Sequence, residues 1–247
     1  MNEEPLVIDR SPDRIVARLN RPEKRNAIDR EMIDALHMLC AELEVEPRIL
    51  ILAGADRVFA AGADITQLRA RRAEDARRGI NALAFIRIHE LPMPVIAAID
   101  GYALGGGAEL AYAADIRIAT PALKIGNPET GLGIMAAAGG AWRLREIVGD
   151  GLASEMLLTG RPLTADEALR AGLISGIHPA SELMTAAHAI ADRIAANDPL
   201  ATRHTKRAMR APRDAHPDID GELQAELFES PEKMRRMTEF LERRGRR

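Results

Sequence analysis

The most apolar stretch of the chain, residues 95–114, constrains the fold because glycine and acidic residues interrupt it. Four glycines and two acidic residues, Asp100 and Glu109, lie within it, so it cannot form a membrane-spanning helix. Its pattern predicts a buried strand over residues 95–99, then a glycine-rich turn, then a helix over about 106–113. The helix would carry a carboxyl group in its first turn.

Short strands interleaved with helices are expected through the first half of the chain, which indicates a mixed α/β fold. We expect the strands at residues 15–19, 48–52, 95–99, 115–119 and 123–125. Asp29 can cap a helix whose apolar face includes Met32 and Leu36. Residues 65–89 alternate between basic and acidic side chains and predict one solvated helix.

From Glu146 onward the pattern is mainly helical. Thr164 and Glu167 form a capping box, and a helix over residues 181–197 is expected to stop at Pro199. The last 30 residues are amphipathic, so they must pack on the body of the chain or on a neighbouring subunit. We therefore expect a mixed body over residues 1–190 and a helical region over residues 191–247.

Composition excludes several classes of function. Aromatic residues make up only 3% of the chain and the net charge is −3, which argues against nucleic-acid and anionic-membrane partners. The single cysteine, Cys40, excludes an internal disulfide, and the six histidines show no metal-binding spacing. The acidic N-terminus lacks the pattern of a signal or transit peptide. We expect a cytoplasmic protein that needs no metal.

Two glutamates lie beside glycine-rich turns, and this arrangement indicates chemistry. Glu109 ends the run Gly105–Glu109, Glu129 ends the run Gly126–Glu129, and a third turn lies upstream at Gly62. Gly62 and Gly106 are expected to adopt backbone conformations that other residues resist. The N–H groups of Ala63 and Gly106 could stabilise a developing oxyanion, and two carboxyl groups could divide proton transfers between them.

Each feature taken alone also has a purely structural interpretation. Glycines before a helix commonly form a tight turn, and a glutamate in the first helical turn commonly interacts with the helix dipole. An aspartate in the position of Asp64 is commonly the N-cap of a helix. The pairs Arg71–Arg72 and Arg77–Arg78 are typical of a solvated face, with a role near a phosphate as the alternative.

Read together, these segments resemble the enoyl-CoA hydratase/isomerase family, the crotonase superfamily, from about Val16 to Leu241. The resemblance rests on the order and spacing of five segments: residues 19–27, 59–65, 99–110, 115–119 and 158–160. It implies a spiral of repeated β-β-α units, followed by a helical region used in trimer contacts. Homotrimers that pair into hexamers are expected.

The resemblance also implies a coenzyme A thioester substrate, of the kind used in fatty acid β-oxidation, and no metal or redox cofactor. It assigns the oxyanion N–H groups to Ala63 and Gly106, and acid–base roles to Glu109 and Glu129. The substrate contacts that we expect are Arg25, Ala27, Ala61, Asp64, Ile65, Gly105, Gly133 and Trp142.

Hydratases of this family carry both glutamates twenty positions apart, as this chain does. The resemblance therefore implies a hydro-lyase: Glu109 would activate water at the β carbon, and Glu129 would transfer a proton at the α carbon. The product would be a 3-hydroxyacyl-CoA. An enoyl-CoA isomerase that uses one glutamate is the alternative enzyme, and a catalytically idle CoA-thioester-binding protein is the alternative without chemistry.

Three segments depart from the family pattern. Ala136–Ala137 stands where a Pro-Gly pair is usual, and Ala141–Trp142 replaces a more typical polar pair, so the indole is expected to reshape the acyl pocket. Residues 232–237 replace the acidic-Gly signature that precedes the last helix. These departures bear on acyl-chain preference and on trimer contacts.

Overall fold

The structure, a computed structural model, describes residues 4–245. The chain divides into two compact units, with the division between Ala191 and Asp192. It falls inside α9 (Leu183–Ala195), so one helix carries the chain from the first unit into the second. Among residues 4–245, no helix has both the length and the apolar character needed to cross a bilayer.

The larger sheet of the first unit has six strands in the order β1-β2-β3-β5-β7-β10. Neighbouring strands are parallel, except that β1 and β2 form an antiparallel pair. β3 and β5 are almost wholly buried, as expected of parallel strands covered on both faces. The six strands are β1 (Leu6–Arg10), β2 (Arg14–Leu19), β3 (Ile49–Gly54), β5 (Val95–Ile99), β7 (Ile116–Ala119) and β10 (Gly176–Ile177).

A smaller sheet has four short strands in the order β4-β6-β8-β9. These are β4 (Val58–Ala60), β6 (Tyr102–Leu104), β8 (Lys124–Gly126) and β9 (Leu163–Thr164). The first three of them follow β3, β5 and β7 in turn, and they lie parallel to one another. A helical segment follows each pair, so a β-β-α unit recurs along the chain. The predicted mixed α/β fold is confirmed.

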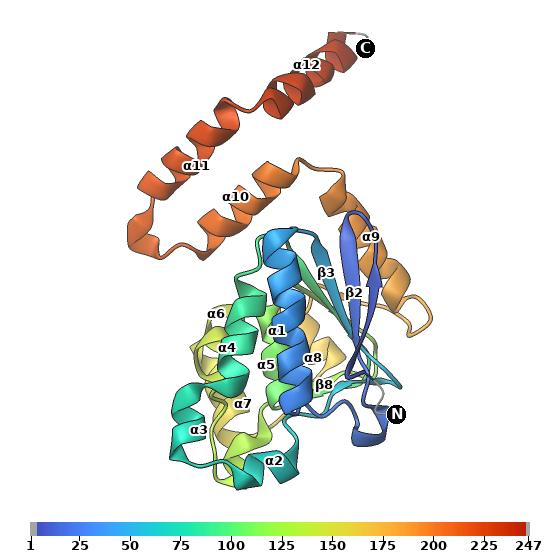
Figure 1. Cartoon of the computed structure of the whole chain (residues 1–247), viewed down its shortest axis with the longest axis vertical. Coiled ribbons are helices and arrows are strands. Elements are labelled where there is room, and N and C mark those ends of the chain that lie inside the picture. The colour runs from blue at the N-terminus through green and yellow to red at the C-terminus, as the bar shows by residue number, and fades with distance from the viewer. Residues whose placement is uncertain (1–3, 246–247) are drawn as a thin grey trace. The chain divides into compact units, whose positions relative to one another are not determined.

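Helices pack on these sheets. α1 (Arg30–Val45) begins at Asp29, whose carboxylate accepts a hydrogen bond from the Met32 N–H at 2.9 Å. It packs against α4 (Ile80–His89), which in turn contacts α5 (Gly106–Ala113) (Figure 1). The other helices of this unit are η1 (Pro22–Lys24), α2 (Ile65–Ala70), α3 (Ala73–Arg78), η2 (Pro128–Leu132), α6 (Gly140–Val148), α7 (Asp150–Thr159) and α8 (Ala165–Arg170).

The prediction of one solvated helix over residues 65–89 is wrong. This segment forms three helices, α2, α3 and α4. The first break lies at Arg71 and Arg72, which have extended backbones, and the second lies at Gly79, with φ 59°. Glycine adopts this left-handed conformation without strain, so it ends one helix and starts the next. α4 also buries one face, which includes Phe85.

Two smaller differences concern the ends of the chain. β1 is absent from the predicted strands, although it pairs with the predicted strand β2. The helix expected over residues 181–197 is α9, which ends before Pro199 as predicted. Pro199 is also the first residue of the next helix, α10 (Pro199–Arg210), which was not predicted. Proline is tolerated there because the first turn of a helix leaves its N–H groups unpaired.

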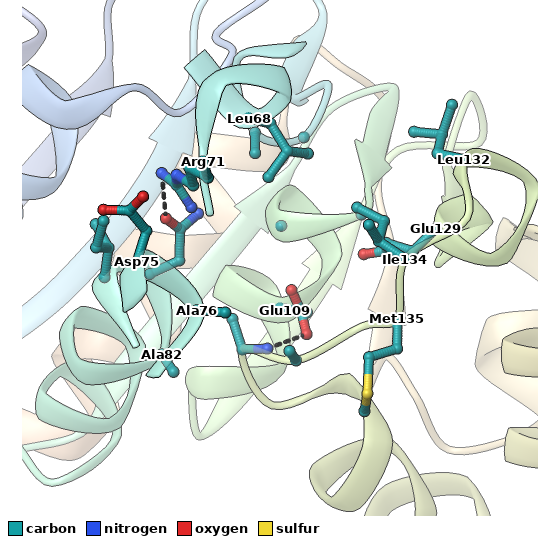
Figure 2. Close-up of a pocket in the computed structure, with 18 of the residues that line it drawn as sticks. Leu68, Arg71, Asp75, Ala76, Ala82, Glu109, Glu129, Leu132, Ile134 and Met135 are labelled. Atoms are coloured by element: carbon teal, nitrogen blue, oxygen red, sulfur yellow. Dashed lines mark hydrogen bonds between the residues drawn. The ribbon is translucent and has the colours of Figure 1, made fainter. Parts of the chain in front are cut away.

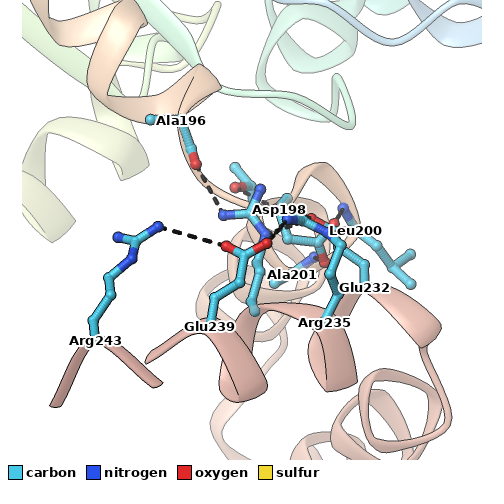
Figure 3. Close-up of polar contacts among 10 residues, drawn as sticks. Ala196, Asp198, Leu200, Ala201, Glu232, Arg235, Glu239 and Arg243 are labelled. Atoms are coloured by element: carbon cyan, nitrogen blue, oxygen red, sulfur yellow. Dashed lines mark hydrogen bonds and ion pairs between the residues drawn. The ribbon is translucent and has the colours of Figure 1, made fainter. Parts of the chain in front are cut away.

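The second unit is helical. After α10 come η3 (Arg213–Ala215), α11 (Asp218–Phe228) and α12 (Pro231–Gly245). Asp198 caps α10 by accepting hydrogen bonds from the N–H groups of Leu200 and Ala201, and the Arg236 guanidinium donates to the Ala196 carbonyl at 2.9 Å (Figure 3). Large apolar side chains are exposed at Phe228, Met234, Met237, Phe240 and Leu241. The trimer-forming role of this region stays a prediction.

Candidate active site

The turn between β6 and α5 is shaped by three consecutive glycines. Gly105 has φ 53°, a conformation that favours glycine, and its N–H donates to the Gly126 carbonyl at 2.8 Å. A Cβ on Gly107 would lie 2.2 Å from the Ala60 oxygen, so only glycine fits there. The conformational freedom predicted for Gly106 is needed at Gly105 instead, because Gly106 has a helical backbone that any residue adopts.

A second turn follows β4 and meets the first. Gly62 has φ 115°, as predicted, and its carbonyl accepts a hydrogen bond from the Ile28 N–H at 2.8 Å. The nitrogen of Ala63 lies 3.5 Å from the point where a Cβ on Gly106 would be. Among the described residues, no protein group accepts a hydrogen bond from the N–H of Ala63 or Gly106. Two unpaired peptide donors therefore lie close together.

Glu109 lies in the first turn of α5 and is only 4% exposed. Its Oε1 accepts hydrogen bonds from the N–H groups of Ala138 at 2.7 Å and Gly140 at 2.9 Å. Burial raises the pKa of Glu109 to about 7; the Gly140 and Ala138 bonds oppose this shift, and the charge of Glu129 adds to it. One carboxylate oxygen is anchored, and Oε2 is left without a backbone donor.

Glu129 lies in the first turn of η2 and is 8% exposed. Its Oε1 accepts a hydrogen bond from Asn127 Nδ2 at 3.3 Å, and its Oε2 is buried without a hydrogen-bond partner among the residues described. Burial raises the pKa of Glu129, and its hydrogen bonds oppose that shift. A buried carboxyl oxygen with no partner is costly in a folded protein, which indicates a place for a ligand group.

Asn127 and Tyr112 support this arrangement, and no motif in the sequence marks either role. The Tyr112 hydroxyl donates to Asn127 Oδ1 at 3.0 Å, which turns the amide nitrogen toward Glu129. Asn127 lies two residues before Glu129, but Tyr112 comes from α5. Because the tyrosine hydroxyl is fully buried, it fixes the amide rather than contacting solvent.

A pocket of about 530 Å³ brings the predicted catalytic residues together (Figure 2). Its lining includes seven residues of the predicted site: Ala61, Ala63, Ile65, Gly105, Gly106, Glu109 and Glu129. Apolar side chains supply much of the rest, among them Leu68, Leu132, Ile134 and Met135. Two carboxyl groups and two unpaired N–H groups thus share a largely apolar space.

The other predicted substrate contacts do not line this pocket: Arg25, Ala27, Asp64, Gly133 and Trp142. The Arg25 carbonyl accepts from the Ala61 N–H at 3.0 Å, and Asp64 caps α2, so both hold the turn that carries Ala63. Trp142 is 45% exposed, with the Arg143 guanidinium 4.2 Å from its ring centre. The indole does not line this pocket, and its effect on the acyl site stays a prediction.

Comparisons with known proteins point to one family. A family model described as "Enoyl-CoA hydratase/isomerase" matches residues 14–246. The chain is 37% identical to a short-chain-enoyl-CoA hydratase of Clostridium acetobutylicum, over 97% of this chain and 95% of that protein. It is 35% identical to a crotonyl-CoA hydratase of Syntrophomonas wolfei, over 99% and 97%.

A solved structure gives the same result for the fold. The chain resembles the crystal structure of an enoyl-CoA hydratase from Bacillus anthracis with a TM-score of 0.91 and 31% identity. The similarity covers 97% of this chain and 96% of that chain.

Proposed function

This chain belongs to the enoyl-CoA hydratase/isomerase family, and from that premise we propose that it adds water across the double bond of a 2-trans-enoyl-CoA. The product is a 3-hydroxyacyl-CoA. The observation that carries the proposal is the pairing of two buried carboxyl groups, Glu109 and Glu129, in one pocket with two unpaired N–H groups.

We assign the thioester oxygen to the N–H groups of Ala63 and Gly106. As water attacks the β carbon, electrons move toward the thioester, and its oxygen gains enolate character. The Gly106 N–H stands at the N-terminus of α5, where the helix dipole also favours negative charge. Each donor that meets this developing charge contributes roughly 3 kcal/mol to the transition state.

We assign the water to Glu109. Its Oε1 is held by two backbone N–H groups, which leaves Oε2 to accept a proton from water. The hydroxyl oxygen then bonds to the β carbon. Because the pKa of Glu109 is about 7, the carboxylate form is available at neutral pH and is basic enough to accept the proton.

Glu129 supplies the second proton. Burial raises the pKa of Glu129, which favours the protonated form, and two carboxyl groups in one apolar pocket resist being ionised together. The proton passes to the α carbon as the enolate collapses. One proton is taken at Glu109 and one is given at Glu129, so the sum is the addition of one water molecule.

The test is the loss of the conjugated enoyl absorbance of crotonyl-CoA, measured with wild type and Glu129→Gln in parallel. We expect rapid loss with wild type and a rate lower by roughly 10²- to 10⁴-fold with the variant. Equal rates in the two proteins would remove Glu129 from the mechanism. Double-bond migration that survives Glu109→Gln would instead identify an isomerase that relies on Glu129.

We also propose that the protein is a homotrimer, or a hexamer of two trimers, and that it works in the cytoplasm without a metal or redox cofactor. The exposed apolar side chains of α12, such as Phe240, support subunit contacts. The single thiol, Cys40, is buried and suits a reducing compartment.

A further inference from the structure

Arg71 places a cation in the wall of the pocket that holds the two glutamates (Figure 2). It follows α2 directly and is partly buried, contrary to the solvated face expected for the Arg71–Arg72 pair. Leu68, Ala76 and Ala82 line the same pocket, and so do the polar side chains of Asp75 and Asn81, so the wall around Arg71 is of mixed character.

Arg71 has no carboxylate within 4.0 Å in the part of the chain that the structure describes. Asp75 acts on it from farther away, and its carboxylate accepts instead from the Arg72 N–H at 2.9 Å. By contrast, Arg87, which is also partly buried, holds Glu44 through two bonds of 2.6 Å. Because a partly buried charge is costly without a counterion, Arg71 is suited to receive an anion.

Asn81 connects Arg71 to the turn that carries Gly106. The Arg71 Nη2 donates to Asn81 Oδ1 at 3.1 Å, and since arginine cannot accept, this bond fixes which way the buried amide points. Asn81 Nδ2 lies 3.6 Å from the point where a Cβ on Gly106 would be. A thioester held at Gly106 therefore lies one side chain away from the guanidinium.

We propose, resting on the proposed function, that Arg71 selects acyl groups that end in a carboxylate, so the preferred substrates are enoyl-CoA esters of short dicarboxylic acids. A guanidinium matches a carboxylate through two parallel hydrogen bonds, which gives both affinity and geometry. An apolar wall alone would instead favour an uncharged acyl chain. Asn81 orients the guanidinium and leaves its other N–H groups for the ligand.

The test measures binding of saturated thioesters, which cannot be hydrated, by isothermal titration calorimetry. Each carboxylated thioester is compared with an uncharged partner of equal chain length: succinyl-CoA with butyryl-CoA, glutaryl-CoA with pentanoyl-CoA, and adipyl-CoA with hexanoyl-CoA. At one or more lengths, wild type should bind the carboxylated member roughly 10- to 100-fold more tightly. Arg71→Gln should abolish that preference and leave the uncharged member bound as before.

Two further variants sharpen the result. Arg71→Lys keeps the charge but loses the planar fork, so it should retain only part of the preference. Arg69→Gln removes an exposed arginine of α2 that does not line the pocket, so this variant should keep the full preference for the carboxylated thioester.

Three outcomes would overturn the proposal. In the first, wild type binds no carboxylated thioester more tightly than the uncharged thioester of equal length. In the second, the preference survives Arg71→Gln. In the third, Arg71→Gln weakens the binding of both thioesters of a pair equally. The last result would place Arg71 on the coenzyme A portion that all the thioesters share, such as its phosphates. Failure of both members to bind wild type would instead refute the thioester site on which the proposed function depends.

Discussion

Glu109 shows how its surroundings set the chemistry of one side chain. The carboxyl group lies in an apolar wall, and burial raises the pKa of Glu109 to about 7 although two N–H groups stabilise its charged form. A carboxyl group in water would be almost fully ionised at neutral pH. In this pocket both protonation states are accessible near neutral pH, which suits a group that accepts a proton and then releases it.

This pKa predicts the acidic limb of the pH–rate profile. Because Glu109 must be ionised to accept a proton from water, kcat/KM for crotonyl-CoA should fall as the pH drops below about 7. The fall should approach tenfold per pH unit. A profile that stays flat from pH 5 to 8 would show that no group with this pKa is needed as a base.

The same pKa predicts how stability depends on pH. The folded state binds the Glu109 proton more tightly than the unfolded state, so stability is lost as pH rises from about 4.5 to about 7. The loss is roughly 3 kcal/mol. Glu109→Gln carries no such proton, so the Tm of the variant minus that of wild type should be larger at pH 8 than at pH 5. An equal difference at both values would contradict this.

At this scale the sequence predicts Glu109, Glu129 and the two backbone donors because each lies beside a glycine-rich turn. It does not predict Tyr112, Asn81 or Arg71, which no local pattern marks. These side chains come from different elements and meet only after folding. The Arg71–Arg72 pair predicts a solvated face, because paired charges usually lie on one, with a role near a phosphate as the alternative.

At the scale of elements, the glycine-rich turn explains how α5 reaches its position. A Cβ on Gly107 would overlap Ala60, which belongs to β4, so the close approach of helix and strand requires glycine. This approach brings the N-terminus of α5 beside Ala63. The donor pair therefore depends on a residue that takes no part in the chemistry.

Gly107→Ala should destabilise the protein by roughly 1 to 3 kcal/mol, because the added methyl group has no space. The free energy of unfolding, measured in urea, checks this. Gly131→Ala is the matched control, since a Cβ there meets nothing within 4 Å and should change stability little. Equal effects of the two substitutions would contradict the packing argument.

The strands β3 and β5 are predictable because each is an apolar run with a clear end, at Gly54 or Pro94, and β7 is predictable because Ile116 and Ile118 alternate with other residues. The helices of residues 65–89 are not, because their first break lies at two arginines that are good helix formers. The Asp75 carboxylate accepts from the Arg72 N–H at 2.9 Å and so marks the start of α3 there. β1 is not predicted because its last two residues, Asp9 and Arg10, are charged and are typical of a loop.

At the scale of the whole molecule, the exposed apolar side chains of α12 predict assembly. A wild-type sedimentation mass of three or six times the 26.9 kDa subunit is expected. Met237→Glu combined with Leu241→Glu should lower that mass toward one subunit, because charge in an apolar interface is costly. Glu242→Gln on the same helix is the control. A single-subunit mass for wild type would refute the assembly.

The overall architecture could be expected from sequence mainly through the order and spacing of several weak segments. Residues 59–65 or 99–110 taken alone fit many proteins. Periodicity identifies strands and helices one at a time, but it does not indicate that β4, β6 and β8 leave the larger sheet to form a second one.

The most direct test of the central claim is the mass of the product formed from crotonyl-CoA in ¹⁸O-labelled water. Wild type should give 3-hydroxybutyryl-CoA with one ¹⁸O atom at the β carbon, and Glu109→Gln should form it roughly 10²- to 10⁴-fold more slowly. A wild-type product with the mass of crotonyl-CoA and a moved double bond would show an isomerase. Unchanged crotonyl-CoA would contradict both the hydratase assignment for this substrate and the role given to Glu109.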